Sequence, residues 1–92
     1  MKFLAVFAHW VDNSQPGLEI VTGDDIPDMR IVITAKSESK ARAIAERYEG
    51  IETNAHEGIG RLKSITPVVG MPENATPLEA YEGWLRPRPA NV

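Results

Sequence analysis

The segment from residue 29 to residue 50 most constrains the possible fold, because its apolar pattern changes period once. From Met29 to Lys36 apolar and polar side chains alternate, which is typical of a strand with one buried and one largely wet face. Apolar residues then recur at helical spacing, and the stripe consists of Ala41, Ile44, Ala45 and Tyr48. Ser37 or Ser39 is expected to cap this helix and Gly50 to stop it. A strand followed by an amphipathic helix predicts an α+β domain.

The N-terminal segment predicts two more strands. Residues 3–11 are apolar on both alternating faces, as in an interior strand that is covered on both sides. Residues 12–17 are dense in turn formers, and residues 18–22 form a short apolar run. These two segments predict a β-hairpin together with the first strand.

The C-terminal half begins with a weak pattern. Residues 51–60 have no clean period and are expected to form a loop. Residues 61–69 predict a strand in which Leu62 faces inward, and Pro67 indicates an edge position or the strand's end.

The end of the chain carries helix-start signals. Thr76 and Glu79 have the spacing of a capping box, and Pro77 suits the first position of a helix. The apolar residues of this short predicted helix are Leu78, Tyr81 and Leu85. Residues 86–92 contain two Arg-Pro pairs and are expected to form an extended tail.

These predictions combine into one domain spanning residues 1–92, with the element order β-β-β-α-β-α. The expected architecture is a mostly antiparallel sheet of three to four strands, with one main helix packed on one face and a short C-terminal helix. If the main helix connects strands 29–36 and 61–69 as a crossover, those two strands run parallel.

The composition limits the chemistry and the cellular compartment that we expect for this protein. The 92 residues include no cysteine, which excludes disulfides and thiolate metal sites, and the net charge is -3. No segment is apolar over the roughly 20 residues that a membrane span needs. An intracellular, cytoplasmic protein without membrane contact is therefore expected. Residues 30–63 are mildly basic, and the rest of the chain is acidic.

Catalytic and metal-binding patterns are missing. His9 and His56 have no metal-ligand spacing, and no nucleophile or phosphate-loop motif occurs. The adjacent pair His56 and Glu57 is the one acid/base candidate, and a solvated polar loop is the simpler interpretation. The acidic loop residues Asp24, Asp25 and Asp28 lack the spacing of a calcium loop. We therefore expect no enzymatic activity, no catalytic or metal-binding residues and no cofactor.

Aromatic and arginine residues predict a protein-binding surface, because tryptophan, tyrosine and arginine are enriched at binding hot spots. The candidates are Trp84, Arg86, Arg88, Tyr81 and Trp10. The alternative is that Tyr81 and Trp84 anchor the last helix to the core.

Basic residues predict a second surface. If strands 29–36 and 61–69 are neighbours, one open sheet face could bind single-stranded nucleic acid. Its residues, with those of the helix flank, are Arg30, Lys36, Arg61, Lys63, Lys40 and Arg47. The alternative is an ordinary solvated face, and the acidic total charge makes nucleic acid the less favoured partner.

In its small size and lack of motifs the chain resembles accessory proteins of bacteriophages and mobile elements, anti-defence proteins among them. This resemblance implies a non-enzymatic module or inhibitor that occupies a surface of a larger protein, through a sheet edge and the Trp84 region. A nucleic-acid binder is the first alternative. A self-associating virion or other assembly subunit, whose tail reaches a neighbour, is the second.

Overall fold

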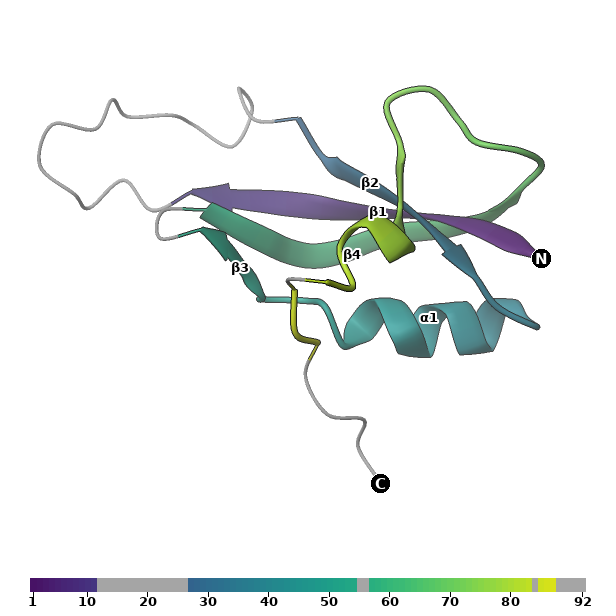
Figure 1. The fold of residues 1–92 in the computed structure, drawn as a ribbon, viewed down its shortest axis with the longest axis horizontal. Coiled ribbons are helices and arrows are strands. Elements are labelled where there is room, and N and C mark those ends of the chain that lie inside the picture. The colour runs from purple at the N-terminus through teal and green to yellow at the C-terminus, as the bar shows by residue number, and fades with distance from the viewer. Residues whose placement is uncertain (12–26, 55–56, 84, 88–92) are drawn as a thin grey trace, which may run out of the picture.

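The computed structural model describes residues 1–11, 27–54, 57–83 and 85–87. Its elements are β1 (Lys2–Val11), β2 (Met29–Thr34), α1 (Glu38–Glu46), β3 (Glu52–Asn54), β4 (Glu57–Val68), β5 (Thr76–Pro77) and the 3-10 turn η2 (Leu78–Ala80). The strands form one curled sheet in the order β3-β4-β1-β2-β5 (Figure 1). The predicted α+β class with one main helix is confirmed, whereas the expected count of three to four strands is too low.

The strand β1 lies at the centre of the sheet. It pairs antiparallel with β2 on one side and with β4 on the other, so β2 and β4 run in the same direction. The crossover prediction is therefore right about direction, but β1 separates the two strands that we expected to be neighbours. Because β5 pairs parallel with β2, the sheet is mixed.

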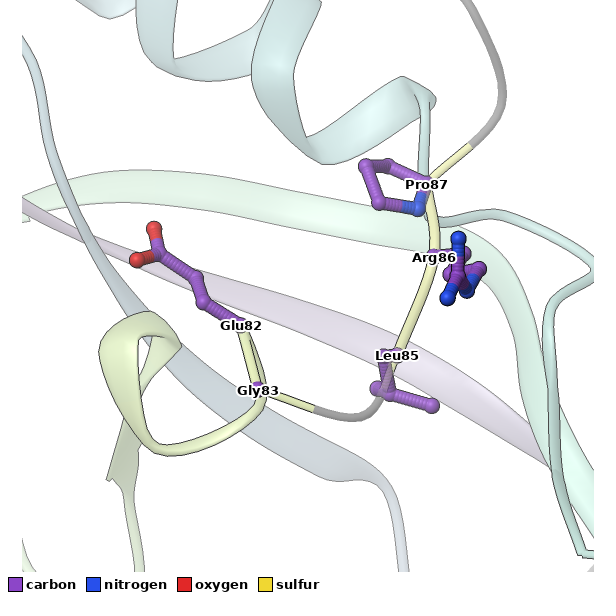
Figure 2. A pocket seen from close by; sticks show the side chains of 5 residues that line it. All are labelled: Glu82, Gly83, Leu85, Arg86 and Pro87. Atoms are coloured by element: carbon purple, nitrogen blue, oxygen red, sulfur yellow. The ribbon is translucent and has the colours of Figure 1, made fainter.

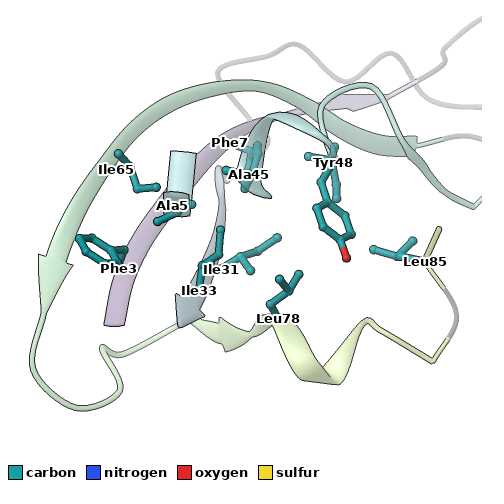
Figure 3. Packing of buried hydrophobic residues seen from close by; sticks show 12 residues of the cluster. Phe3, Ala5, Phe7, Ile31, Ile33, Ala45, Tyr48, Ile65, Leu78 and Leu85 are labelled. Atoms are coloured by element: carbon teal, nitrogen blue, oxygen red, sulfur yellow. The ribbon is translucent and has the colours of Figure 1, made fainter. Parts of the chain in front are cut away.

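The core lies between α1 and one face of the sheet (Figure 3). Alternate residues of β1 supply its centre, because period-two alternation points Phe3, Ala5 and Phe7 to the same side. The other buried members are Ile31, Ile33, Ala41, Ala45, Tyr48, Ile59, Ile65, Leu78 and Leu85. The predicted stripe of α1 thus faces the core, with Ile44 partly buried at its border.

Local signals fix the ends of α1. The Ser37 side chain accepts a hydrogen bond from the Lys40 backbone N–H at 3.3 Å, which confirms Ser37 as the cap. The helix ends at Glu46, and a turn leads to Gly50. Gly50 has a φ of 80°, a conformation that glycine adopts without steric cost.

The sheet face away from the core is less polar than the alternation in β2 predicted. Val32 alternates with the core residues Ile31 and Ile33 and so lies on the face that the alternation predicts to be wet, yet its exposed fraction is 2%. It pairs in register with Leu4 on one side and Pro77 on the other. Because β2 lies between two strands that supply apolar neighbours, Val32 is buried.

The loop predicted for residues 51–60 is wrong. The structure has β3 at residues 52–54, and β4 begins at Glu57. The sequence signal failed because Gly58 and Gly60 lie inside β4, where close neighbours leave no room for a side chain. A Cβ at Gly60 would stand 2.8 Å from the Ala8 carbonyl oxygen.

The predicted C-terminal helix is present only as a single 3-10 turn, and its expected start is a strand. Thr76 and Pro77 extend along β2 as β5, and η2 spans only three residues, Leu78–Ala80. Pro77 is the residue before this turn, and it offers no side-chain oxygen to cap the first N–H groups. Leu85 is nevertheless buried as expected.

Three sequence predictions lie outside the described residues: the hairpin turn 12–17, its strand 18–22 and the tail beyond Pro87. Within the described part of the chain, no helix is long and apolar enough to cross a membrane.

Candidate functional site

Of the predicted protein-binding residues, the structure describes Tyr81, Arg86 and Trp10. Trp84 and Arg88 lie outside the described residues. Arg86 is exposed, while Tyr81 packs against the core, as the alternative interpretation expected. Trp10 lies near the C-terminal end of β1, in the region where β3 and β4 pair.

A shallow pocket of about 760 Å³ lies beside this C-terminal segment. Its lining residues are Glu82, Gly83, Leu85, Arg86 and Pro87. Figure 2 shows that the Glu82 and Arg86 side chains point in different directions, so they form no paired polar site. Arg86 therefore remains an exposed cation beside an open depression.

The buried phenol of Tyr48 lies beside Leu85 of the C-terminal segment. Figure 3 shows its ring reaching from the end of α1 toward Leu85 and Leu78. Burial raises the pKa of Tyr48 above its ordinary value, the Glu82 carboxylate raises it further, and Arg47 acts in the opposite direction. Tyr48 is thus a neutral core residue at neutral pH.

The six basic candidates are distributed over several elements. Lys40 belongs to α1 and Arg47 follows it, whereas Arg30 lies half-buried on β2. Lys63 of β4 is paired with Asp28 at 2.9 Å, and this ion pair reaches across β1. Because β1 separates β2 from β4, the predicted face is not one continuous basic surface.

The remaining two basic candidates, Lys36 and Arg61, are exposed. Lys36 follows the end of β2, and Arg61 lies within β4.

The structure describes only one member of the acid/base candidate pair, and it lies beside another histidine. His56 lies outside the described residues, and Glu57 instead faces His9, with 3.4 Å between Oε2 and Nε2. This pair spans β4 and β1, close to Trp10. Asp24 and Asp25 also lie outside the described residues, and Asp28 is engaged by Lys63. In the ranges that the structure describes, no three acidic or histidine side chains gather as a metal site.

The most distinctive surface feature is one that the sequence reasoning missed. Among the described residues, the large apolar side chains that are exposed are Met1, Val69 and Met71, with exposed fractions of 72%, 104% and 48%. Met1 and Val69 lie at one end of the sheet, because Lys2 pairs with Val68 and their outer neighbours are Met1 and Val69. Met71 follows two residues after Val69, in the connection that leaves β4 at this end. We call Met1, Val69 and Met71 the apolar end.

The connection from β4 to β5 carries two members of the apolar end. In Figure 1 this connection arches away from the body of the domain on the side opposite α1. It contains two residues with positive φ, Gly70 at 76° and Asn74 at 58°. Glycine and asparagine tolerate this left-handed conformation, which lets the chain turn twice before it joins β2. The apolar run Val69-Gly70-Met71-Pro72 is visible in the sequence, but the exposure of Val69 and Met71 depends on the tertiary fold.

Cations flank the apolar end. Lys2 follows Met1 directly, and Lys36 follows Ala35, whose N–H donates to the Met1 carbonyl at 3.0 Å. Both lysines are exposed, and neither has an acidic partner among the described residues. The β4–β5 connection itself carries a single charged side chain, Glu73.

Comparisons of the chain with models of known families, with curated proteins and with solved structures gave no match.

Proposed function

We propose that this chain is a small non-enzymatic protein-binding module, and that the apolar end is its contact surface. One observation carries the proposal: the exposed large apolar residues of the described chain lie where β1 begins and in the connection that leaves β4 beside it. Scattered apolar residues are normal on a protein surface, whereas clustered ones mark sites where another molecule binds.

The chemistry of the cluster supports a protein partner. Methionine side chains are flexible and polarizable, so Met1 and Met71 can adapt to an uneven apolar surface. Val69 is rigid and fully exposed, so burying it against a partner would contribute about 1.5–3 kcal/mol. In this proposal the module acts by covering a surface of a larger protein, as an accessory or inhibitor protein would, and it catalyses no reaction.

The other proposed roles predict different partners. A nucleic-acid binder would depend on Arg30, Arg61 and the other cations, which lie on separate elements of the fold. An assembly subunit would bind further copies of itself. Both remain alternatives that the same experiment distinguishes.

The test is capture of partners from lysate by the tagged wild type, by Val69→Asp and by Ala43→Asp. Ala43 is an exposed residue of α1, so its variant introduces the same charge away from the apolar end. We expect a stoichiometric protein partner that wild type and Ala43→Asp retain and Val69→Asp loses. Equal capture by all three folded proteins, or recovery of nucleic acid or of further copies alone, would contradict the proposal.

A further inference from the structure

The methionine side chains differ in their surroundings. The chain has three methionines and no cysteine, so its thioethers are the sulfur groups on which an oxidant can act. Met1 is 72% exposed and Met71 is 48% exposed, and both belong to the apolar end. Met29 is partly buried and packs against the core. The two accessible thioethers therefore lie at the proposed contact surface, and the shielded one lies away from it.

Met71 lies outside the packed body of the domain. It belongs to the connection from β4 to β5, which arches away on the side opposite α1 (Figure 1). Gly70, the residue before it, has a φ of 76°, and Pro72 follows it. Among the described residues, those that pack against the core do not include Met71. A polar group at this position would therefore change the surface without removing a core contact.

We infer that Met71 is an oxidative modification site, and that its conversion to methionine sulfoxide by a peroxide releases the partner of the apolar end. This inference rests on the proposed function and specifies how that contact is regulated. Met1 is a second accessible thioether at the same surface, and its oxidation would act in the same direction.

The chemical step needs only a peroxide as co-reactant. The thioether sulfur of Met71 attacks one oxygen of hydrogen peroxide, an S–O bond forms and the O–O bond breaks. The displaced hydroxide takes the proton of the transferred oxygen and leaves as water. The sulfur is oxidised by two electrons and the peroxide is reduced. Methionine sulfoxide reductases restore the thioether, so the change is reversible.

The sulfoxide would weaken the contact for a physical reason. The thioethers and Val69 present apolar surface that a partner can bury. A sulfoxide oxygen is hydrated in the free protein, and an apolar contact takes away this water without supplying a hydrogen bond. We expect the oxidised protein to bind its partner about tenfold or more weakly.

The first measurement needs no partner. The folded full chain is treated with hydrogen peroxide, and peptide mapping by mass spectrometry follows each methionine over time. We expect Met71 and Met1 to gain oxygen before Met29, and this order to disappear when the chain is unfolded in urea. Oxidation of Met71 no faster than that of Met29 in the folded protein would overturn the inference.

The second measurement compares two variants that differ in polarity at the same position. Met71→Gln places a polar amide there permanently, whereas Met71→Leu keeps an apolar side chain that a peroxide does not oxidise. Both should unfold at the urea concentration of the wild type. In capture from lysate, we expect Met71→Leu to retain the protein partner and Met71→Gln to lose it. Peroxide should weaken capture by the wild type more than by Met71→Leu, and sulfoxide reductase should restore it.

The outcomes separate the two proposals. If Val69→Asp loses a captured protein that both Met71→Gln and the peroxide-treated wild type retain, the proposed function stands and this inference fails. A wild type that captures no protein overturns the proposed function, and the regulation inferred from it falls as well. Equal loss of capture by peroxide-treated wild type and Met71→Leu would also overturn the role of Met71.

Discussion

The indole ring of Trp10 lies directly against the Cα of Gly58 on the neighbouring strand. A Cβ built at Gly58 would stand 2.5 Å from Trp10 Cζ2 and 2.6 Å from the Ile51 carbonyl oxygen. Real side chains do not approach this closely, so any residue other than glycine must push β1 and the β3 end of the sheet apart. We predict that Gly58→Ala lowers the free energy of unfolding by about 1–3 kcal/mol.

Chemical denaturation of Gly58→Ala, alone and combined with Trp10→Leu, checks this prediction. The double variant should recover only part of the loss, because the Ile51 carbonyl still occupies the space that the new methyl group needs. A Gly58→Ala protein as stable as the wild type would show that the two strands are not packed in this way.

The Glu49 carboxylate should stabilise the fold through the Leu62 N–H. Glu49→Ala leaves this donor without its acceptor, and we expect a loss of about 1 kcal/mol in the free energy of unfolding. Glu49→Gln keeps an acceptor oxygen and should lose less. Amide exchange supplies the site-specific measurement: Leu62 should exchange faster in Glu49→Ala, with no change at Ile65. Unchanged exchange at Leu62 would rule out this hydrogen bond.

The buried phenol of Tyr48 predicts a fall in stability at alkaline pH. Its pKa is raised in the folded protein above the ordinary value of 10.0, so the folded state holds the proton more tightly than the unfolded state. The resulting stabilisation is present below about pH 10 and is lost as the pH rises from the unfolded pKa toward the folded one.

Urea denaturation between about pH 8 and pH 11 tests this effect, with Tyr48→Phe as the matched variant. The phenylalanine protein should fill the same space and show a weaker decrease at the alkaline end. Identical pH profiles for the two proteins would mean that Tyr48 does not contribute in this way.

A core substitution should lower the free energy of unfolding strongly, whereas a substitution at the apolar end should leave it nearly unchanged. Ile33 is 1% exposed between α1 and the sheet, and Ile33→Ala should cost about 2–5 kcal/mol. Val69 is fully exposed, so Val69→Ala should change stability by no more than about 0.5 kcal/mol. Thermal unfolding of both variants provides the comparison. A large loss for Val69→Ala would assign this residue to folding instead of binding.

The parts of the fold that the sequence predicted correctly are those governed by local chemistry. Ser37 caps α1 by accepting a hydrogen bond from the Lys40 backbone N–H, three residues later in the chain. This contact is local and needs no tertiary context. The alternation in residues 29–36 likewise placed Ile31 and Ile33 on one buried face, and both belong to the core.

The errors arise where tertiary contacts override local signals. Gly58 indicates a loop by composition, yet it is a strand residue because Trp10 requires the space. Thr76 and Pro77 resemble a helix start, but backbone pairing with β2 extends them. The apolar end could not be predicted, since Met1 and Met71 are 70 residues apart and only strand pairing brings their neighbourhoods together.

The most direct test of the apolar end as a binding surface is site-specific photo-crosslinking in cells. A photoreactive amino acid at position 69 is compared with the same amino acid at position 52. Glu52 is exposed on β3 and lies near the opposite end of β1, about 27 Å away at ~3.4 Å per strand residue. The account predicts an adduct with one protein partner from position 69 and none from position 52. No adduct from position 69, or equal adducts from both positions, would contradict it.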